Sequence, residues 1–311
     1  MTPTESGSFP FFRFKGIQVS VHWSWFVVAV IEISTRRAHY ASPVWNVAEY
    51  LALFLIVLLH EFGHVLACRQ VGGHANKIVL WPLGGVAYVS PPIRPGATLW
   101  SIAAGPLVNV ALLPILFGLG WFGGSQGWKE SMPDVAKLIA TIAFINLSLL
   151  IFNLLPIYPL DGGQILQALL WFPLGRARSL FVATIIGMIG VAGLLVVAMW
   201  QQSLWTGFMA LFLGQQCWAG FQYARGLAAL AKLPRHSGFA CPSCHEPPAG
   251  GPILPCSQCG QRFDPFSTNA ICPHCQTANA TTRCIYCGTA HPIAHWSAIE
   301  IRAESVGEKG N

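Results

Sequence analysis

The chain has 311 residues, of which 53% are hydrophobic and only 10% are charged, and its mean hydropathy is +0.52. This composition excludes an ordinary soluble globular protein and predicts an integral membrane protein. The formal net charge of +6 belongs to the apolar part, because residues 1–235 hold 14 Lys and Arg against 7 Asp and Glu, whereas residues 236–311 hold 4 against 5.

The N-terminal segment, residues 1–16, ends in an aromatic and basic run, and an apolar run of about spanning length follows from Ile17 to Ile33. A cleaved signal peptide is the alternative interpretation. The run contains His22 and three aromatic residues in VHWSWF and is not followed by a convincing small-residue cleavage site. We therefore predict that it is the first membrane helix.

The second predicted span, about residues 47–69, carries His60, Glu61 and His64 in its second half. Residues four apart share one face of a helix, so the two imidazoles can bind one metal ion with Glu61 beside it. In this H-E-x-x-H arrangement the metal lowers the pKa of a bound water and the glutamate accepts its proton, as in metalloproteases. A chance match is less plausible here, because an unpaired glutamate in hydrocarbon costs on the order of 2.5 kcal/mol or more.

Residues 78–89 are too few to span a membrane and have two strand-like pieces around Pro82, Gly84 and Gly85, which predict a β-hairpin. The hairpin could be a packing flap, or it could offer a strand edge to an extended substrate. Both interpretations stay open. A third span follows at about residues 97–122, where small residues precede Asn109, and this places the asparagine inside the bundle.

A fourth span, about residues 135–155, leads into NLLPIYPLDGG at 153–163. Asp161 is the only acid between Leu138 and Phe172 and requires a partner. It could cap a helix that starts at Gly162. With H-E-x-x-H on another helix, we favour Asp161 as the third ligand of the same metal ion, since catalytic zinc takes three protein ligands.

Two further apolar runs, about residues 180–200 and 205–224, bring the predicted spans to six. With the N-terminus inside, ten flanking Lys and Arg residues lie on the inner side and four on the outer side. This bias predicts a multi-pass protein of the cytoplasmic membrane with both termini in the cytoplasm. The expected fold is an all-α polytopic membrane protein with a short membrane-associated β-hairpin, comprising residues 17–225, and residues 226–240 form a linker.

The remaining residues form a small domain with eight cysteines in four C-x-x-C pairs. CPSC and CSQCG recur about 30 residues later as CPHC and CIYCG, so we predict two successive zinc ribbons, at 241–259 and 272–287, followed by a tail at 288–311. The first structural zinc would be bound by Cys241, Cys244, Cys256 and Cys259, and the second by Cys272, Cys275, Cys284 and Cys287. Disulfides are disfavoured in a cytoplasmic tail. A net charge of −1 favours a protein partner over nucleic acid.

Three motifs carry a family resemblance: HEFGH at 60–64, GPLVN at 105–109 and NLLPIYPLDGG at 153–163. Together they resemble the site-2 protease family of intramembrane zinc metalloproteases, and VHWSW at 21–25 is similar to its bacterial six-span members. The resemblance implies catalytic zinc bound by His60, His64 and Asp161, with Glu61 as general base and then proton donor to the leaving amine. It associates Asn153 with substrate binding or oxyanion support, and Asn109 is a weaker candidate for substrate binding. It does not cover the ribbons.

The expected function is cleavage of a peptide bond in or near the transmembrane segment of a single-pass membrane protein within the lipid bilayer. One alternative is a non-proteolytic zinc-binding scaffold or receptor that signals through the ribbons, although such a protein needs no general base beside its ligands. A metal transporter is a third alternative. It is disfavoured because the spans carry few further ionisable residues along a path.

Overall fold

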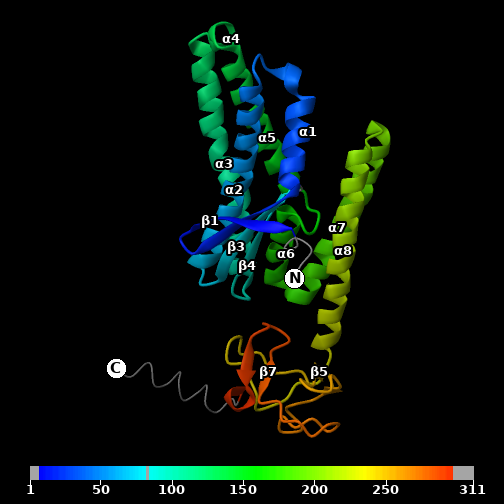
Figure 1. Ribbon diagram of the computed structural model, residues 1–311. Coiled ribbons are helices and arrows are strands. Elements are labelled where there is room, and N and C mark those ends of the chain that lie inside the picture. Colours follow the sequence, from blue (N-terminus) through cyan, green and yellow to red (C-terminus); the bar gives the residue numbers. More distant parts are fainter. Residues whose placement is uncertain (1–6, 82–83, 297–311) are drawn as a thin grey trace. The chain divides into compact units, whose positions relative to one another are not determined.

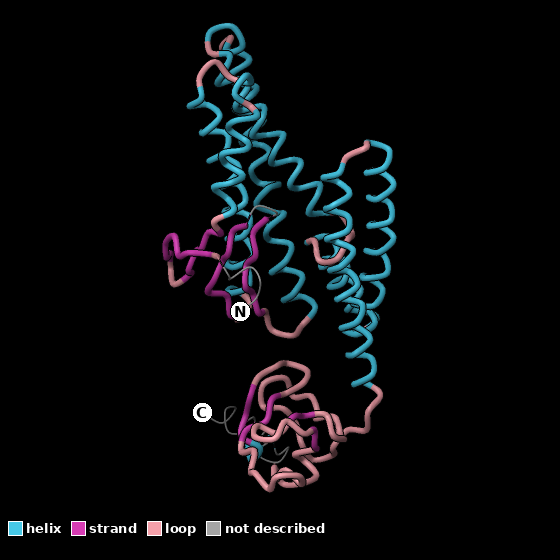
Figure 2. Tube along the Cα trace, turned by 45° about the vertical axis from the view of Figure 1, so that its right-hand side comes forward, coloured by secondary structure: helices cyan, strands magenta, loops and turns pink. Residues whose placement is uncertain are grey.

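The computed structural model describes residues 7–81 and 84–296, and the chain forms two compact units, Met1–Gln222 and Tyr223–Asn311 (Figure 1). The first unit consists of long helices and one small sheet. The second consists of loops and short strands, as the colouring by secondary structure shows (Figure 2).

Four helices in the described residues are long and apolar enough to cross a membrane. They are α2 (Pro43–Gln70), α3 (Pro95–Ser125), α5 (Pro133–Leu154) and α7 (Arg176–Gln201). The shortest of them has 22 residues, which gives about 33 Å of helix against roughly 30 Å of hydrocarbon. Each corresponds to one predicted span, so the protein is a predominantly helical, polytopic membrane protein.

The first predicted span is wrong as a single helix. Ile17–His22 is a strand, β2, and only Ser24–Thr35 is helical, as α1. The 12 residues of α1 reach about 18 Å, which is too short to cross the hydrocarbon alone. The strand forms because Val19 and Val21 are β-branched and fit a central strand, where their side chains are buried in the core shared with α2.

The last predicted span corresponds to α8 (Leu204–Ala231), which is 28 residues long but falls outside the set of apolar spanning helices in the described part of the chain. Gln215, Gln216 and Arg225 interrupt its apolar sequence. The short helix α4 (Trp128–Ser131), between α3 and α5, was not predicted, whereas α6 (Asp161–Leu174) corresponds to the helix expected to start at Gly162.

The predicted hairpin is present as β3 (His74–Trp81) and β4 (Gly84–Ser90), but it belongs to a larger sheet. β1 (Ser8–Phe14) pairs antiparallel with β2, β2 pairs parallel with β3, and the strand order is β1-β2-β3-β4. The buried residues of β2 and β3 pack with Val57, Val65 and Cys68 of α2. The sheet therefore lies against the end of α2 that carries the H-E-x-x-H motif.

The second unit has two small cores. Two hairpins, β5 (Leu254–Pro255) with β6 (Arg262–Phe263) and β7 (Thr281–Arg283) with β8 (Ala290–Pro292), precede a 3₁₀ turn at Ile293–Trp296. Burial opposes ionisation of Asp264, but hydrogen bonds from the Gly251 N–H and the His236 ring hold its pKa below the usual range. Asp264 thus connects His236, which precedes the cysteine clusters, to the loop at Gly251.

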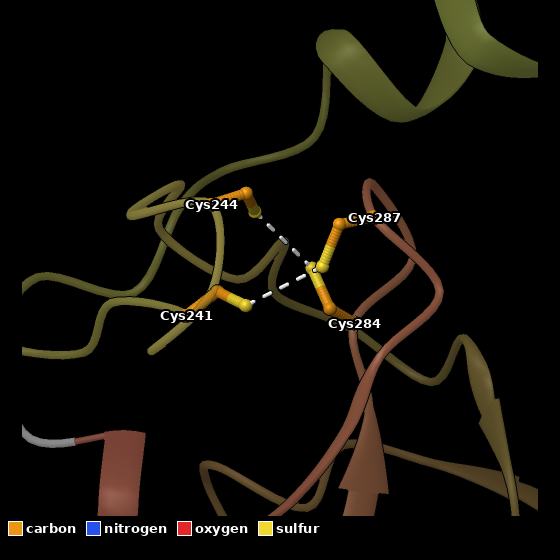
Figure 3. A group of neighbouring side chains, drawn as sticks. All are labelled: Cys241, Cys244, Cys284 and Cys287. Atoms are coloured by element: carbon orange, nitrogen blue, oxygen red, sulfur yellow. Dashed lines mark hydrogen bonds between the residues drawn. The ribbon is translucent and has the colours of Figure 1, made fainter. Parts of the chain in front are cut away.

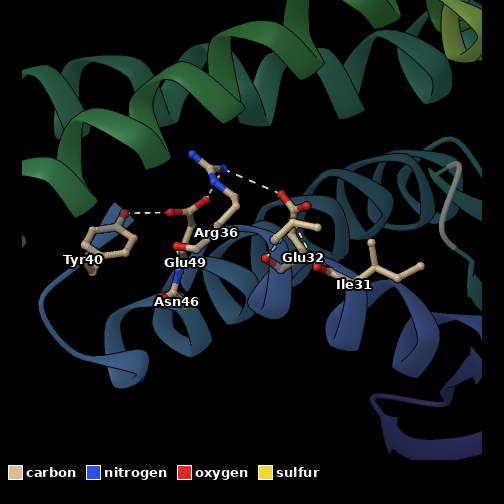
Figure 4. A network of polar contacts seen from close by, with 7 residues as sticks. Ile31, Glu32, Arg36, Tyr40, Asn46 and Glu49 are labelled. Atoms are coloured by element: carbon tan, nitrogen blue, oxygen red, sulfur yellow. Dashed lines mark hydrogen bonds and ion pairs between the residues drawn. The ribbon is translucent and has the colours of Figure 1, made fainter. Parts of the chain in front are cut away.

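A polar network joins the turn after α1 to the first turns of α2 (Figure 4). Arg36 pairs with Glu49, and the Tyr40 hydroxyl donates to the other oxygen of Glu49 at 2.6 Å. The Asn46 amide donates to the Arg36 carbonyl at 2.8 Å. Glu49 is only 5% exposed, so its charge is stabilised by these partners and not by water.

Glu49→Ala should lower the free energy of unfolding by about 2 kcal/mol, because Arg36 and Tyr40 lose a buried charged acceptor. Glu32→Ala is the matched control: Glu32 also contacts Arg36, at 3.6 Å, but both side chains are about a third or more exposed, and about 0.5 kcal/mol or less is expected. Thermal unfolding of the two variants in detergent measures the difference. Equal destabilisation would contradict the assignment of Glu49 as the centre of the network.

Candidate metal centre and cysteine clusters

Three predicted metal ligands converge in the helical unit. His60 and His64 lie one turn apart on α2, and Asp161 is the first residue of α6. His60 Nε2 is 3.0 Å from Asp161 Oδ2, and His64 Nε2 is 3.5 Å from Asp161 Oδ1. All three residues are at most 9% exposed. The structure thus brings together residues that are about 100 positions apart in the chain.

Two buried asparagines determine which ring nitrogen of His60 carries the proton. The Asn146 amide donates to the backbone carbonyl of Asn109 at 2.9 Å, which identifies the other side-chain atom of Asn146 as its oxygen. The Asn109 amide donates to that oxygen at 2.8 Å, so the Asn109 oxygen faces His60 Nδ1, 2.6 Å away. His60 Nδ1 must therefore be the donor, and Nε2 carries a lone pair.

The same reasoning applies to His64, whose Nδ1 lies 2.9 Å from the backbone carbonyl of Ser101 and must donate to it. The Nε2 atoms of the two histidines lie 3.1 Å apart. Asp161 Oδ2 is buried and makes no hydrogen bond in the described structure. Both Nδ1 atoms are thus engaged elsewhere, while the two Nε2 atoms and the Asp161 carboxylate converge on one point, an arrangement that suits a shared metal ion.

This donor set fits zinc. Two imidazoles and one carboxylate are the ligands of many catalytic zinc sites, where a fourth position stays open. The ligand atoms all lie within 4.8 Å of one another. The histidine rings are oriented by an amide and a carbonyl, as is usual for metal-binding histidines.

A glycine of α3 allows the rings to occupy this position. A Cβ atom on Gly105 would lie 2.3 Å from His64 Nε2 and 2.8 Å from His60 Nε2. Gly63 of α2 likewise packs against the backbone of Ala104, where a Cβ atom would lie 2.7 Å from the carbonyl oxygen. The close approach of α2 and α3 thus depends on residues without side chains.

Glu61 lies between the histidines and the sheet. Its carboxylate accepts a hydrogen bond from the Ala87 N–H of β4, and a Cβ atom on Gly85 would lie 2.2 Å from Glu61 Cγ. Because the Ala87 N–H points to Glu61, it points away from β3, and the edge of β4 that has no strand neighbour among the described residues faces the metal-ligating residues. The predicted hairpin therefore borders the site directly.

The ligating residues and Glu61 line one cavity of about 540 Å³, with Gly85, Asn153 and Gln164 also in its wall. Asn153, predicted to be catalytic, is thus beside the site. Asn109, predicted to bind substrate, lines the same cavity; it is fully buried, and its amide is hydrogen-bonded to His60 and Asn146. Asn146 was not singled out from the sequence; an asparagine within the apolar run of α5 was the available signal.

The eight cysteines of the second unit form two groups, but not those predicted from the repeat. Cys241 and Cys244 face Cys284 and Cys287, as Figure 3 shows. The other group consists of Cys256, Cys259, Cys272 and Cys275. The prediction of two successive ribbons at 241–259 and 272–287 is therefore wrong: the first pair joins the fourth, and the second joins the third.

The nested grouping follows from the two hairpins. The 256–259 pair lies in the turn between β5 and β6, and the 284–287 pair lies in the turn between β7 and β8. Each turn is completed by a pair from a loop. Packing decides which loop pairs with which turn, because Cys241 and Cys284 share a core with Phe266 and Trp296, whereas Cys256 and Cys272 pack with Phe263.

The sulfur positions suit metal ions. Cys241 Sγ lies 3.6 Å from Cys287 Sγ, and Cys244 Sγ lies 3.7 Å from Cys284 Sγ; the second group has the same spacings. A tetrahedron with zinc–sulfur distances of about 2.3 Å has edges of about 3.8 Å. Backbone N–H groups of Cys259 and Gln258 lower the pKa of the Cys256 thiol, which favours the thiolate that binds metal.

The comparisons with known proteins agree with this geometry. Residues 48–134 and 126–197 match peptidase family M50. The helical unit of this chain therefore belongs to the M50, or site-2 protease, family of zinc metalloproteases. This range includes every residue of the His60, His64 and Asp161 cluster.

Individual relatives are similar over the same region. The chain is 34% identical over 178 residues to zinc metalloprotease MJ0392 of Methanocaldococcus jannaschii, covering 57% of this chain and 49% of that protein. It is 30% identical over 251 residues to the putative zinc metalloprotease Rip3 of Mycobacterium tuberculosis, covering 71% and 63%. The chain thus spans about half to two thirds of these relatives.

A solved structure is also similar. The site-2 protease from Methanocaldococcus jannaschii superposes with a TM-score of 0.51 at 27% sequence identity, and the match covers 69% of this chain and 95% of that chain. The fold as well as the sequence therefore places the helical unit in this family.

Gly105→Ala should strongly reduce zinc at the His60 and His64 site, because the added methyl group would occupy the space of both Nε2 atoms. Gly118→Ala on the same helix is the control, since a Cβ atom there has no neighbour within 4 Å. Elemental analysis of both variants, truncated after Arg235 to remove the cysteine clusters, measures the effect. Full zinc content in Gly105→Ala would contradict the described packing.

Proposed function

We propose that this chain is an intramembrane zinc endopeptidase that cleaves a peptide bond in or near the transmembrane segment of a membrane-protein substrate. The observation that carries the proposal is the set of three mutually facing acceptors on His60, His64 and Asp161, with the Glu61 carboxylate in the same cavity. A protein that only stored or bound zinc would need no carboxylate beside the ligands.

Zinc held by these three residues would supply a Lewis acid and lower the pKa of water at its open position. Glu61 would accept a proton from the attacking water and later donate it to the leaving amine. The Ala87 N–H holds the Glu61 carboxylate in place for both transfers. Asn153, in the cavity wall, supports the developing oxyanion or positions the substrate.

The substrate would bind in extended form beside β4. Helical carbonyls are hydrogen-bonded and shielded, so a substrate helix must unwind before it can be attacked. The edge of β4 opposite β3 faces the site and offers backbone partners to an unwound segment. A single-pass membrane protein supplies such a segment without further unfolding of a bundle.

The orientation in the cytoplasmic membrane follows from the positive charges. The Arg69 guanidinium donates to the Lys15 carbonyl at 2.7 Å, and Gln18 of β2 pairs with Lys77 of β3. Basic residues from three segments thus gather at one end of α2. We assign this end to the cytoplasm. The N-terminal strands lie at the same end through the pairing of β2 with β3, and α8, taken as a further crossing, returns the C-terminus to that side, so both chain termini are assigned to the cytoplasm.

The two cysteine clusters are proposed to be structural zinc sites, because four thiolates leave no open position for water. Zinc would then number one catalytic and two structural ions per chain. Such a small unit has few buried apolar residues and depends on metal for its fold. Its surface is proposed to bind a protein partner that regulates the protease, and nucleic acid is disfavoured by the low positive charge.

Glu61→Gln should reduce cleavage by a factor of about 10² to 10⁴ or more while zinc content stays unchanged, because the amide cannot accept the proton but the ligands are intact. The measurement combines elemental analysis with cleavage of transmembrane peptides in detergent micelles, and Glu130→Gln, outside the cavity, is the control. A substantially active Glu61→Gln variant would refute the assignment of the base. A wild-type protein that holds zinc and cleaves none of the peptides would favour the non-proteolytic scaffold.

The nested cysteine grouping gives a second test. Cys241→Ser together with Cys284→Ser should remove one structural zinc, since both residues belong to one cluster. Cys241→Ser together with Cys256→Ser should remove both. The measurement is the zinc content per full-length chain. Loss of two zinc ions in the Cys241 and Cys284 variant, and of one in the Cys241 and Cys256 variant, would instead support sequential ribbons.

A further inference from the structure

A second cavity of the helical unit lies apart from the metal centre. It has a volume of about 470 Å³ and is lined by residues of α3, α5 and the short helix α4. Figure 1 shows α4 at the end of the bundle, where the chain passes from α3 to α5. None of its lining residues belongs to the cavity of the metal centre. Its wall is almost entirely apolar and includes Phe117, Ile139, Phe144 and Leu147.

The cavity exists because α3 lacks side chains on this face. Gly120 and Gly124, one turn apart, both line it, and a Cβ atom on Gly124 would have no neighbour within 4 Å. Trp128 of α4 closes one end by packing on Gly123, where a Cβ atom would lie 2.5 Å from the indole ring. Its ring also contacts Phe122 edge to face, with centroids 5.8 Å apart.

The apolar wall of the cavity determines which kind of molecule can bind there. α3 and α5 are both membrane-spanning helices, so the medium around the cavity is lipid, and an apolar cavity of this kind is not filled by water. One helical turn of about 10 Å diameter and 5.4 Å pitch already occupies roughly 400 Å³. Phe117 and Phe144 of the wall are 57% and 70% exposed, so the cavity opens to the surrounding lipid, and its small volume suits a flexible hydrocarbon chain.

One charged residue completes the site. Lys129 is the only charged side chain among the lining residues, and it lies beside Trp128; Glu130 follows in the sequence but is not part of the wall. Tryptophan and lysine are the residues that anchor proteins at the lipid headgroup level. We propose that this cavity binds one anionic phospholipid, with an acyl chain between α3 and α5 and the headgroup phosphate at Lys129.

The site is placed to act on the metal centre. The same two helices carry Asn109 and Asn146, whose hydrogen bonds orient His60, and Leu147 of the cavity wall directly follows Asn146. A bound acyl chain fixes the separation of α3 and α5 next to this pair. Lipid binding itself does not depend on proteolysis and is the property to be tested.

The test uses the full-length, delipidated protein in nanodiscs or detergent with added dioleoylphosphatidylglycerol or dioleoylphosphatidylcholine. Native mass spectrometry counts retained lipid, and thermal unfolding measures its stabilising effect. We expect one tightly retained phosphatidylglycerol, preferred over phosphatidylcholine by about fivefold, as one lysine near a lipid surface provides. Lys129→Gln should abolish this preference, Lys129→Arg should keep it, and Lys137→Gln, a cation outside the wall, is the control.

Ala140→Phe fills the cavity from α5 and should prevent retention of either lipid. The control is Ala111→Phe, the same change at an exposed position of α3 outside the lining set, which should leave retention unchanged. Retention of phosphatidylglycerol by both Lys129→Gln and Ala140→Phe at the wild-type level would overturn the proposal and indicate general boundary lipid. Equal retention of the two lipids by the wild-type protein would refute the headgroup assignment.

Discussion

The helical unit depends on one constraint: the ligand atoms of His60, His64 and Asp161 must converge on one point. The backbone carbonyl of Asn109 accepts a hydrogen bond from the Asn146 amide and so fixes the orientation of that amide. The Asn146 oxygen fixes the orientation of the Asn109 side chain, whose oxygen requires the proton of His60 to be on Nδ1. In His64 the backbone carbonyl of Ser101 likewise requires a proton on Nδ1. Because a backbone carbonyl can only accept, the direction of each hydrogen bond is determined, and both histidines direct Nε2 toward Asp161.

The bundle is packed to hold this arrangement. Burying such groups without a partner is costly in a membrane, so the helices must approach closely enough to supply every partner from within. Gly105 and Gly63 allow the contact of α2 with α3, and Gly162 allows α6 to lie against the end of α5, where a Cβ atom would be 2.3 Å from the Leu154 oxygen. Small residues thus occur beside the polar ones, because they let the helices approach closely enough for the polar side chains to reach their partners.

The two units are stabilised in different ways. The helical unit buries apolar residues between the sheet and α2, and its buried acidic side chains, Glu49, Glu61 and Asp161, lie in the polar network after α1 and in the metal centre. The second unit has only two small cores, each built around cysteines. In such a unit the thiolate clusters act as the core itself, which explains why buried aromatic residues such as Trp296 and Phe266 pack directly on them.

Local sequence was sufficient wherever one segment carries the whole signal. The H-E-x-x-H motif places His60, Glu61 and His64 on one helix through its periodicity, and an isolated acid in an apolar run identified Asp161, because both depend on rules of spacing and of solvation. Five of the six predicted spans are continuous helices for the same reason. Tertiary structure decided the rest: Ile17–His22 became a strand because β3 was available as a partner; Asn146 gained its role from a helix that is remote in sequence. The cysteine pairs nested because packing around Trp296 and Phe263, and not the order of the repeat, determined which sulfurs meet.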